Sequence, residues 1–131
     1  MYRAIQFRAK RTKADDPQER FIEGSLLSFQ DIHGKRVCSI VSDAGKHNEI
    51  QLDTIGEFTG LKDKNGTPIF EGDIVSFVFK GRVVCSEVAW CQHSASFYLK
   101  QQSAHLLTSE YAEKYTIIGN IYDNPEFLKT K

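Results

Sequence analysis

Residues 57–75 read EFTGLKDKNGTPIFEGDIV and combine short apolar runs with frequent turn signals. The pair Asn65-Gly66 suits the positive φ angles of a tight hairpin turn. Pro68 has no backbone N–H to donate to a ladder, which favours an edge position or the start of a strand. The pair Gly72-Asp73 then breaks the chain before a new alternating run. The stretch therefore predicts a corner at which a sheet turns back and a further strand begins.

The sequence on both sides of this corner follows the period of two that is typical of half-buried strands. Ile5 and Phe7 fall on one face of a first strand, and His33-Gly34 and Lys80-Gly81 are predicted turns between later strands. The runs that we predict as strands are residues 3–7, 21–29, 36–41, 74–79, 82–90, 96–100 and 116–122.

One segment has a different period. Leu107, Tyr111 and Tyr115 recur at intervals of four, which predicts an amphipathic helix over residues 103–115. Near the end, Asn124 can cap a closing helical turn and Pro125 can occupy its first position. We therefore expect a mainly β chain, α+β at the margin: a small barrel-like antiparallel meander with an N-terminal β part and one or two short C-terminal helices. We expect residues 1–131 to form a single domain.

The composition is that of a soluble globular protein of 131 residues, 40% of them hydrophobic. Lys and Arg together number 17, as do Asp and Glu, so a nucleic acid would need a local basic patch. Three cysteines favour reduced thiols in the cytoplasm. No apolar run reaches the ~18 residues of a membrane helix, and the first residues do not resemble a signal peptide. We expect no membrane association.

Three segments of the chain match a known family pattern: GEFTGLKDKNGTPIFEGDIV at residues 56–75, IQFRAK at 5–10 and IIGNIYDNPEFL at 117–128. They resemble the YopX family of phage and prophage proteins. The resemblance implies a single YopX-like domain of a phage or prophage protein inside a bacterial host cell. The family has no settled activity, so the resemblance assigns no catalytic or ligand residue. The matched motif residues are Gly60, Asp63, Asn65, Gly66, Glu71, Gly72 and Asp73.

Asp63, Glu71 and Asp73 lie close in the sequence, and grouped carboxylates can hold Mg²⁺ or act as general acid and base. They make a metal-dependent hydrolase one hypothesis. The alternative is that Asp63 starts a turn through its side-chain oxygen and that Asp73 accepts backbone N–H bonds before a strand. We favour this structural interpretation and predict no catalytic residue, metal or cofactor.

Cys85, Cys91, His93 and His105 are residue types that bind zinc. Their spacing is not that of a zinc knuckle, and on a straight strand Cys85 and Cys91 would stand about 20 Å apart. We therefore interpret the cysteines as structural thiols. The glycines match neither of the phosphate-binding motifs G-x-x-x-x-G-K-[ST] and G-x-G-x-x-G.

A nucleic-acid interface is the remaining alternative, because small barrels bind strands through exposed aromatic rings flanked by basic side chains. The basic residues available near the N-terminus are Arg8, Lys10, Arg11 and Lys13, with Arg3 before them. The aromatic residues available are Phe77, Phe79, Trp90, Phe97 and Tyr98. We favour a core role for these rings.

The function that the sequence favours is binding or assembly without catalysis. A β-rich chain leaves strand edges that must be covered, charged or paired, so we expect a homo-oligomer. A host or phage protein is a further candidate partner.

Overall fold

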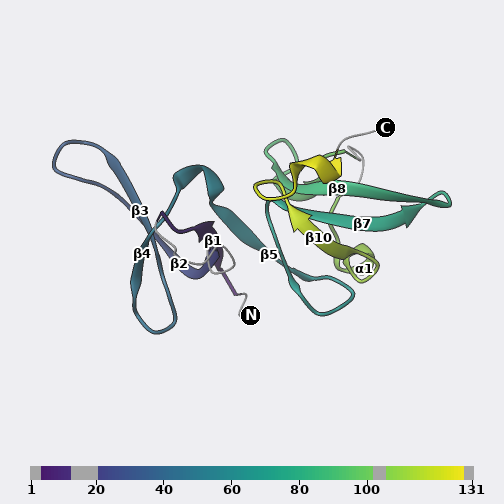
Figure 1. Ribbon diagram of the computed structural model, residues 1–131, viewed down its shortest axis with the longest axis horizontal. Helices are drawn as coiled ribbons and strands as arrows, with labels where there is room; N and C mark the ends of the chain where they lie inside the picture. Colours follow the sequence, from purple (N-terminus) through teal and green to yellow (C-terminus); the bar gives the residue numbers. More distant parts are fainter. Residues whose placement is uncertain (1–3, 13–20, 102–105, 129–131) are drawn as a thin grey trace. The chain divides into compact units, whose positions relative to one another are not determined.

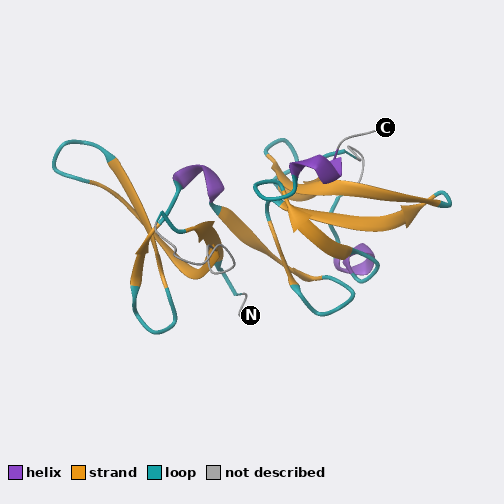
Figure 2. Cartoon of the chain, in the orientation of Figure 1, coloured by secondary structure: helices purple, strands orange, loops and turns teal. Residues whose placement is uncertain are grey.

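The computed structural model describes residues 4–12, 21–101 and 106–128 of the chain. Strands dominate these residues, with a few short helical turns (Figure 2). The elements, in chain order, are β1 (Phe7–Lys10), β2 (Phe21–Gln30), β3 (Arg36–Val41), β4 (His47–Glu49), η2 (Leu52–Thr54), β5 (Gly56–Lys62), β6 (Pro68–Phe70), β7 (Asp73–Phe79), β8 (Arg82–Cys91), β9 (Ser96–Leu99), α1 (Ser109–Ala112), β10 (Thr116–Asn120) and η3 (Pro125–Leu128).

The chain divides into two compact units, Met1–Phe58 and Thr59–Lys131. Strand β5 runs through the boundary between them. The hydrogen-bonded strand orders are β4-β3-β2-β1-β5-β6 and β10-β7-β8-β9. Figure 1 labels these strands except β6 and β9. Every strand pair with a determined register is antiparallel. The prediction of a mainly β chain with few short helices is confirmed.

The first unit is built on the long β2–β3 hairpin. Strand β1 pairs with residues 21–24 of β2, and β4 pairs with residues 39–41 of β3. Alternate side chains of these strands enclose a small apolar core of Ala9, Cys38, Ile40 and Ile50. The other face of the hairpin carries no such cluster in the described residues.

Three hairpin turns in the described part of the chain share one design. Each begins with Asp or Ser, whose side chain accepts the backbone N–H four residues later, and each has Gly at the fourth position. The turns are Asp31–Lys35, Ser42–Lys46 and Asp63–Thr67. The glycine N–H returns to the first residue's carbonyl in all three. Only the glycine takes a positive φ there, 80° at Gly66, so the prediction of a positive φ is right for Gly66 and wrong for Asn65. The geometry is a type I turn followed by a left-handed residue.

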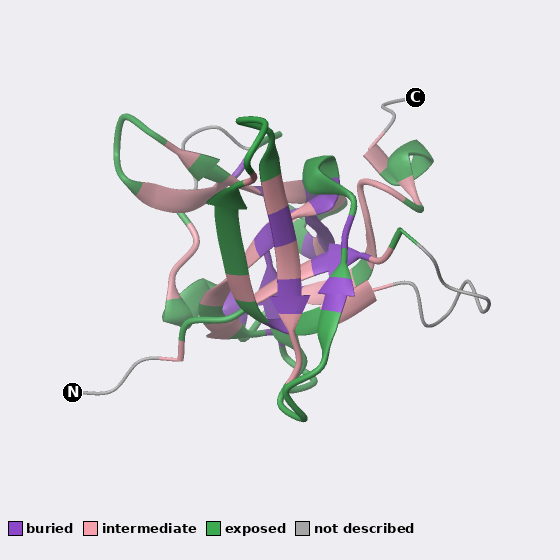
Figure 3. Cartoon of the chain, turned by 90° about the vertical axis from the view of Figure 1, so that its left-hand side faces the viewer, coloured by how far each residue is buried: buried purple, intermediate pink, exposed green. Residues whose placement is uncertain are grey.

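The second unit contains the four-stranded sheet. Apolar side chains from β6, β7, β8 and β9 pack with Ala112 and Tyr115 on one face of it. Residues 75–78 alternate as predicted, with Val75 and Phe77 buried and Val78 exposed, whereas Ile74 on the opposite face is buried as well. Lys80 and Gly81 form the two-residue turn between β7 and β8. Most buried residues lie on strands, and the turns are largely exposed (Figure 3).

The predicted helix over residues 103–115 is wrong. Residues 102–105 lie outside the description, and Leu106 and Leu107 bond to β9 instead of forming a helical turn. Thr108 caps the N-terminus of α1, which is only four residues long. The spacing of Leu107 and Tyr115 wrongly indicated a helix. Both side chains reach the same core, but they do so from irregular backbone.

Two further expectations need correction. The first strand begins at Phe7, and Ile5 lies exposed before it. In the described residues the sheets have open ends and do not close into a barrel, because β9 and β10 are terminal strands of one sheet and pair with β8 and β7 alone. The closing turn at Pro125 is the predicted one, as a 3-10 helix. None of the helices in the described residues has the length and apolar character needed to span a bilayer.

Candidate functional site

The Asp63 carboxylate accepts three backbone hydrogen bonds. Its Oδ1 accepts the backbone N–H groups of Asn65 and Thr67, each at 2.9 Å, and so closes the β5–β6 hairpin. Its Oδ2 accepts the N–H of Ile117 in β10 at 3.0 Å. The side chain, only 5% exposed, thus joins a local turn to a strand 54 residues away in the sequence.

The pKa of Asp63 is lowered, although burial by itself would raise it. The N–H groups of Ile117, Thr67 and Asn65 all point at the carboxylate, and the Lys64 ammonium adds a smaller attraction. These groups stabilise the ionised form more than burial destabilises it. Asp63 is therefore a carboxylate held in place by its own turn.

Asp73 and Gly72 form the second half of the predicted corner. Asp73 is buried, and its Oδ2 accepts the N–H of Phe70 at 2.8 Å. Gly72 takes a φ of 94°, as expected for a sharp bend before β7, and its carbonyl accepts the N–H of Ile121. A Cβ at Gly72 would lie 3.3 Å from the Tyr122 ring. Gly60, within β5, also takes a positive φ, of 89°, which is not the extended conformation of a regular strand.

The geometry favours the structural interpretation of the three acids over the hydrolase. Asp63 and Asp73 direct oxygens into their own turns, and Glu71 lies half-buried between them on the surface of the corner. In the parts of the chain that the structure describes, no group of three or more His, Cys, Asp or Glu side chains could hold a metal ion.

The cysteines do not combine with histidines into a site in the described residues. Cys38, Cys85 and Cys91 are all free thiols. A hydrogen bond from the Ser94 side chain lowers the pKa of Cys91, together with the backbone N–H groups of Ser94 and His93. His105 lies outside the described residues.

Two of the five aromatic residues proposed as stacking surfaces, Phe77 and Phe79, pack in the core. Phe77 is buried against Tyr115, with ring centroids 4.8 Å apart, and Phe79 packs on the same core. Phe97 and Tyr98 are half-buried. Trp90 alone of the five is exposed, at 45%, and its ring stacks edge-on against Phe97.

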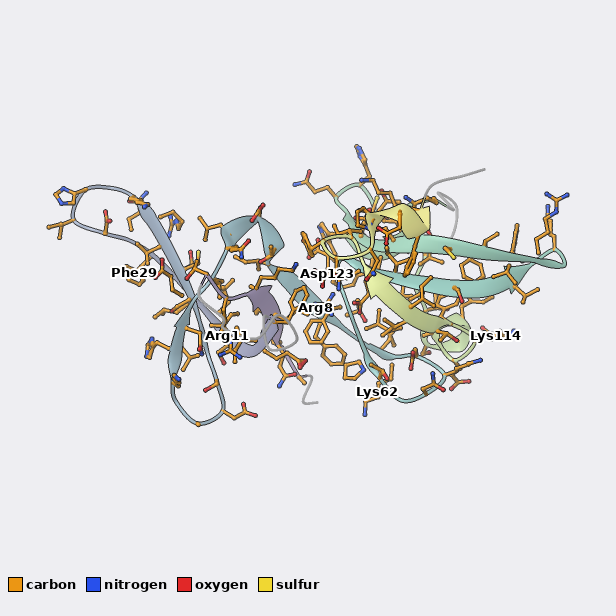
Figure 4. The ribbon with its side chains drawn as sticks, viewed as in Figure 1. Arg8, Arg11, Phe29, Lys62, Lys114 and Asp123 are labelled. Atoms are coloured by element: carbon orange, nitrogen blue, oxygen red, sulfur yellow. The ribbon has the colours of Figure 1, made fainter. Side chains whose placement is uncertain are left out.

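The basic N-terminal residues are not a solvated patch. Arg8 and Lys10 both lie over the Phe21 ring, 4.8 and 5.5 Å from its centroid, and Lys10 is only 6% exposed. Lys13 lies outside the described residues. Arg11 is half-buried just beyond β1, near the label in Figure 4.

The feature that sequence reasoning missed is an arm formed by residues 27–38. In the described residues this distal half of the β2–β3 hairpin has no strand beside either edge, because β1 and β4 pair only with its base. The arm exposes Leu27, Phe29 and Ile32. Figure 4 shows Phe29 on it. The available signal in the sequence was the unequal length of the predicted strands, because a long strand beside a short one leaves part of its edge unpaired.

The three segments that resembled one family also meet in the structure. Residue 6 accepts the N–H of Phe58, so the first segment pairs with the start of the central one. Ile117 and Ile121 of the last segment donate to Asp63 and Gly72 of the central one. A model of the YopX protein family matches residues 6–129. The chain belongs to the YopX family.

One similar solved structure is the crystal structure of protein EF1440 from Enterococcus faecalis. It shares 28% sequence identity and a TM-score of 0.62 with this chain. The alignment covers 98% of this chain and all of that one. No curated protein matches. The family match runs through both compact units, and single-domain behaviour stays a prediction.

Proposed function

We propose that this YopX-family chain is a non-catalytic binding and assembly module, encoded by a phage or prophage and acting in the cytoplasm of a bacterial host. The observation that carries the proposal is the arm of residues 27–38. An isolated two-stranded ribbon is marginally stable in water, and it is favoured when a partner covers it. We therefore expect a partner to bind at this ribbon.

The exposed side chains of the arm support an apolar contact. Phe29 is 46% exposed and Ile32, in the turn, is 95% exposed. Leu27, Phe29 and Val37 lie on one face of the ribbon, because Phe29 pairs directly with Val37 and Leu27 is two residues away. Clustered exposed apolar side chains of this kind mark interaction surfaces.

The edges of the arm support pairing by backbone hydrogen bonds. Residues 27–30 of β2 and 36–38 of β3 present one unpaired edge each within the described residues. Unpaired N–H and C=O groups favour the addition of another strand. Beside the arm, Val37, Cys38 and Leu52 line part of a pocket of about 200 Å³ that could receive a side chain.

The partner that we propose is a second copy of the chain. An arm that carries its own open edges and apolar face can pair with the same arm of another copy around a two-fold axis. Such an interface is self-complementary without any further component. A host or phage protein with an exposed strand is the alternative occupant.

Light scattering at micromolar concentration tests the proposal. We expect a defined oligomer for the parent and a monomer for the double variant Phe29→Ser, Ile32→Ser. The control is Val78→Ser, which removes an exposed apolar side chain from the second unit. A parent that is monomeric at every concentration would remove self-association, and an unchanged oligomer in the double variant would exclude the arm.

A further inference from the structure

A pocket of about 250 Å³ lies in the first unit beside the turn between β3 and β4. It is lined by residues from two separate segments, Arg11 and Thr12 after β1 and Lys46, His47, Asn48 and Glu49 along β4. Its lining therefore gathers three nitrogen-bearing basic side chains and a single carboxylate.

The backbone fixes Arg11 beside β4. Arg11 forms a β-bridge with Ile50, and the Thr12 N–H donates to the Glu49 carbonyl at 3.1 Å. The Gln51 side chain donates to the Arg11 carbonyl at 3.2 Å. The guanidinium thus starts from a rigid position at the pocket wall.

Among the described residues, the Arg11 side chain leaves a hydrogen-bonding requirement unmet. Its Nε is buried and, within the described residues, has no hydrogen-bond partner. A buried donor without an acceptor is costly, and each case in a native protein needs an explanation. Arg11 lines the adjoining pocket, and a ligand acceptor there would satisfy Nε once the side chain moves toward it, because that atom is buried in the present arrangement.

The other lining groups determine the charge of that ligand. The Asn48 amide already donates to the carbonyls of Ile40 and Lys46, and the Thr12 hydroxyl to that of Glu49. Lys46 and His47 are exposed and extend the basic character of the wall. With two permanent cations against the one Glu49 carboxylate, the pocket favours an anion with several oxygen acceptors.

We infer that this pocket binds a phosphate group, held by the Arg11 guanidinium and the Lys46 ammonium, with the His47 imidazole as a further donor. The inference goes beyond the proposed assembly function and uses different residues. A free phosphate or phosphomonoester and the phosphodiester backbone of a nucleic acid share this chemistry.

Amide chemical shifts from nuclear magnetic resonance test the inference with inorganic phosphate as the probe, at constant ionic strength. We expect saturable shifts at Arg11, Thr12 and residues 46–49. Arg11→Met and Lys46→Met should each weaken binding about tenfold, the cost of losing a charge-assisted hydrogen bond. Lys46 is exposed, so its variant keeps the fold even if the Arg11 variant does not.

The matched control is Arg82→Met, which removes an exposed guanidinium from the β7–β8 hairpin of the second unit and should leave phosphate binding unchanged. Shifts that spread over basic residues of both units without saturation, or equal affinity in parent and Lys46→Met, would overturn the site.

A short oligothymidylate distinguishes the two sources of phosphate. Displacement of inorganic phosphate from the same amides, with affinity that falls steeply as salt rises, would identify a nucleic-acid backbone as the ligand class. Saturable phosphate binding that the oligonucleotide does not displace would support a small phosphorylated compound. If neither inorganic phosphate nor the oligonucleotide binds, the inference is overturned.

Discussion

Asp63 and Asp31 occupy the same position in two turns of identical design, and they differ in one bond. Asp31 accepts two local N–H groups, from His33 and Lys35, and is half-buried. Asp63 accepts the two equivalent bonds and a third from Ile117. The pair isolates what the long-range bond contributes to stability.

We predict that Asp63→Asn loses about 1–3 kcal/mol of stability at pH 7, since the neutral amide has one acceptor oxygen where two were in use. Asp31→Asn should lose less, because its local bonds need a single oxygen. Urea unfolding of both variants measures the difference. Equal losses would show that the bond from Ile117 contributes nothing.

The pH dependence of the Asp63 contribution follows from its lowered pKa. Unfolded, the group has its ordinary pKa of 3.8, and the native value is lower. Between these two values the unfolded chain binds more protons, so stability rises with pH there. The contribution is complete above 3.8 and is lost as the pH falls through the native pKa. Acid unfolding should therefore be less steep in Asp63→Asn than in the parent.

Gly66 tests the corner independently of charge. Its φ is 80°, and a Cβ there would meet no atom within 4 Å, so a substitution acts through the backbone alone. We predict that Gly66→Val costs about 1–2 kcal/mol. Asn65→Val is the control, at a neighbour without positive φ. Identical thermal unfolding of Gly66→Val and the parent would contradict the turn geometry.

Tyr115 carries a hydroxyl whose burial has no compensation in the described residues. The oxygen is buried without a hydrogen-bond partner, and burial raises the pKa of the phenol, with a smaller contribution from Tyr111. We predict that Tyr115→Phe is as stable as the parent or more stable by up to about 1 kcal/mol. A clear loss of stability in denaturant unfolding would indicate a partner for the hydroxyl.

Strands β2 and β3 approach each other closely where the arm begins. A Cβ on Gly24 would lie 2.2 Å from the Val41 carbonyl oxygen, and backbone cannot yield as a side chain end can. We predict that Gly24→Ala destabilises the chain by about 1–3 kcal/mol, the cost of overpacking. Ser25→Ala, at the exposed neighbour, is the control for denaturant unfolding. A neutral Gly24→Ala would mean that the two strands separate without cost.

The strand elements were predictable where pattern and turn chemistry agreed. Strand β7 alternates from Val75 to Val78, and Lys80-Gly81 separates it from β8. The helix over residues 103–115 failed because a period of four recorded a shared core and not a helix. The bond from Ile117 to Asp63 has no local signal, since its partners are 54 residues apart. The arm could not be predicted for a similar reason. Its open edges depend on where the strands that pair beside the β2–β3 hairpin end, and the local sequence does not show this.

At the scale of the whole molecule, two cores serve one chain. Strand β5 runs from Gly56 to Lys62 without a linker. The same strand pairs with β1 and with β6, so one element takes part in both pairings. We predict a single cooperative unfolding transition, with equal calorimetric and van't Hoff enthalpies. Two resolved transitions in calorimetry would divide the chain at Phe58 into two domains.

The position of β10 also dictates an order of events during synthesis. Chains are made from the N-terminus and fold as segments emerge. The strand partners of β1, β2, β3 and β4 have all left the ribosome once Phe58 has. In contrast, Asp63 and the outer edge of β7 wait for Ile117 and its neighbours to be translated. During that interval the nascent chain carries a completed first unit followed by an unpaired strand edge, and this is the stage at which a chaperone has most to protect.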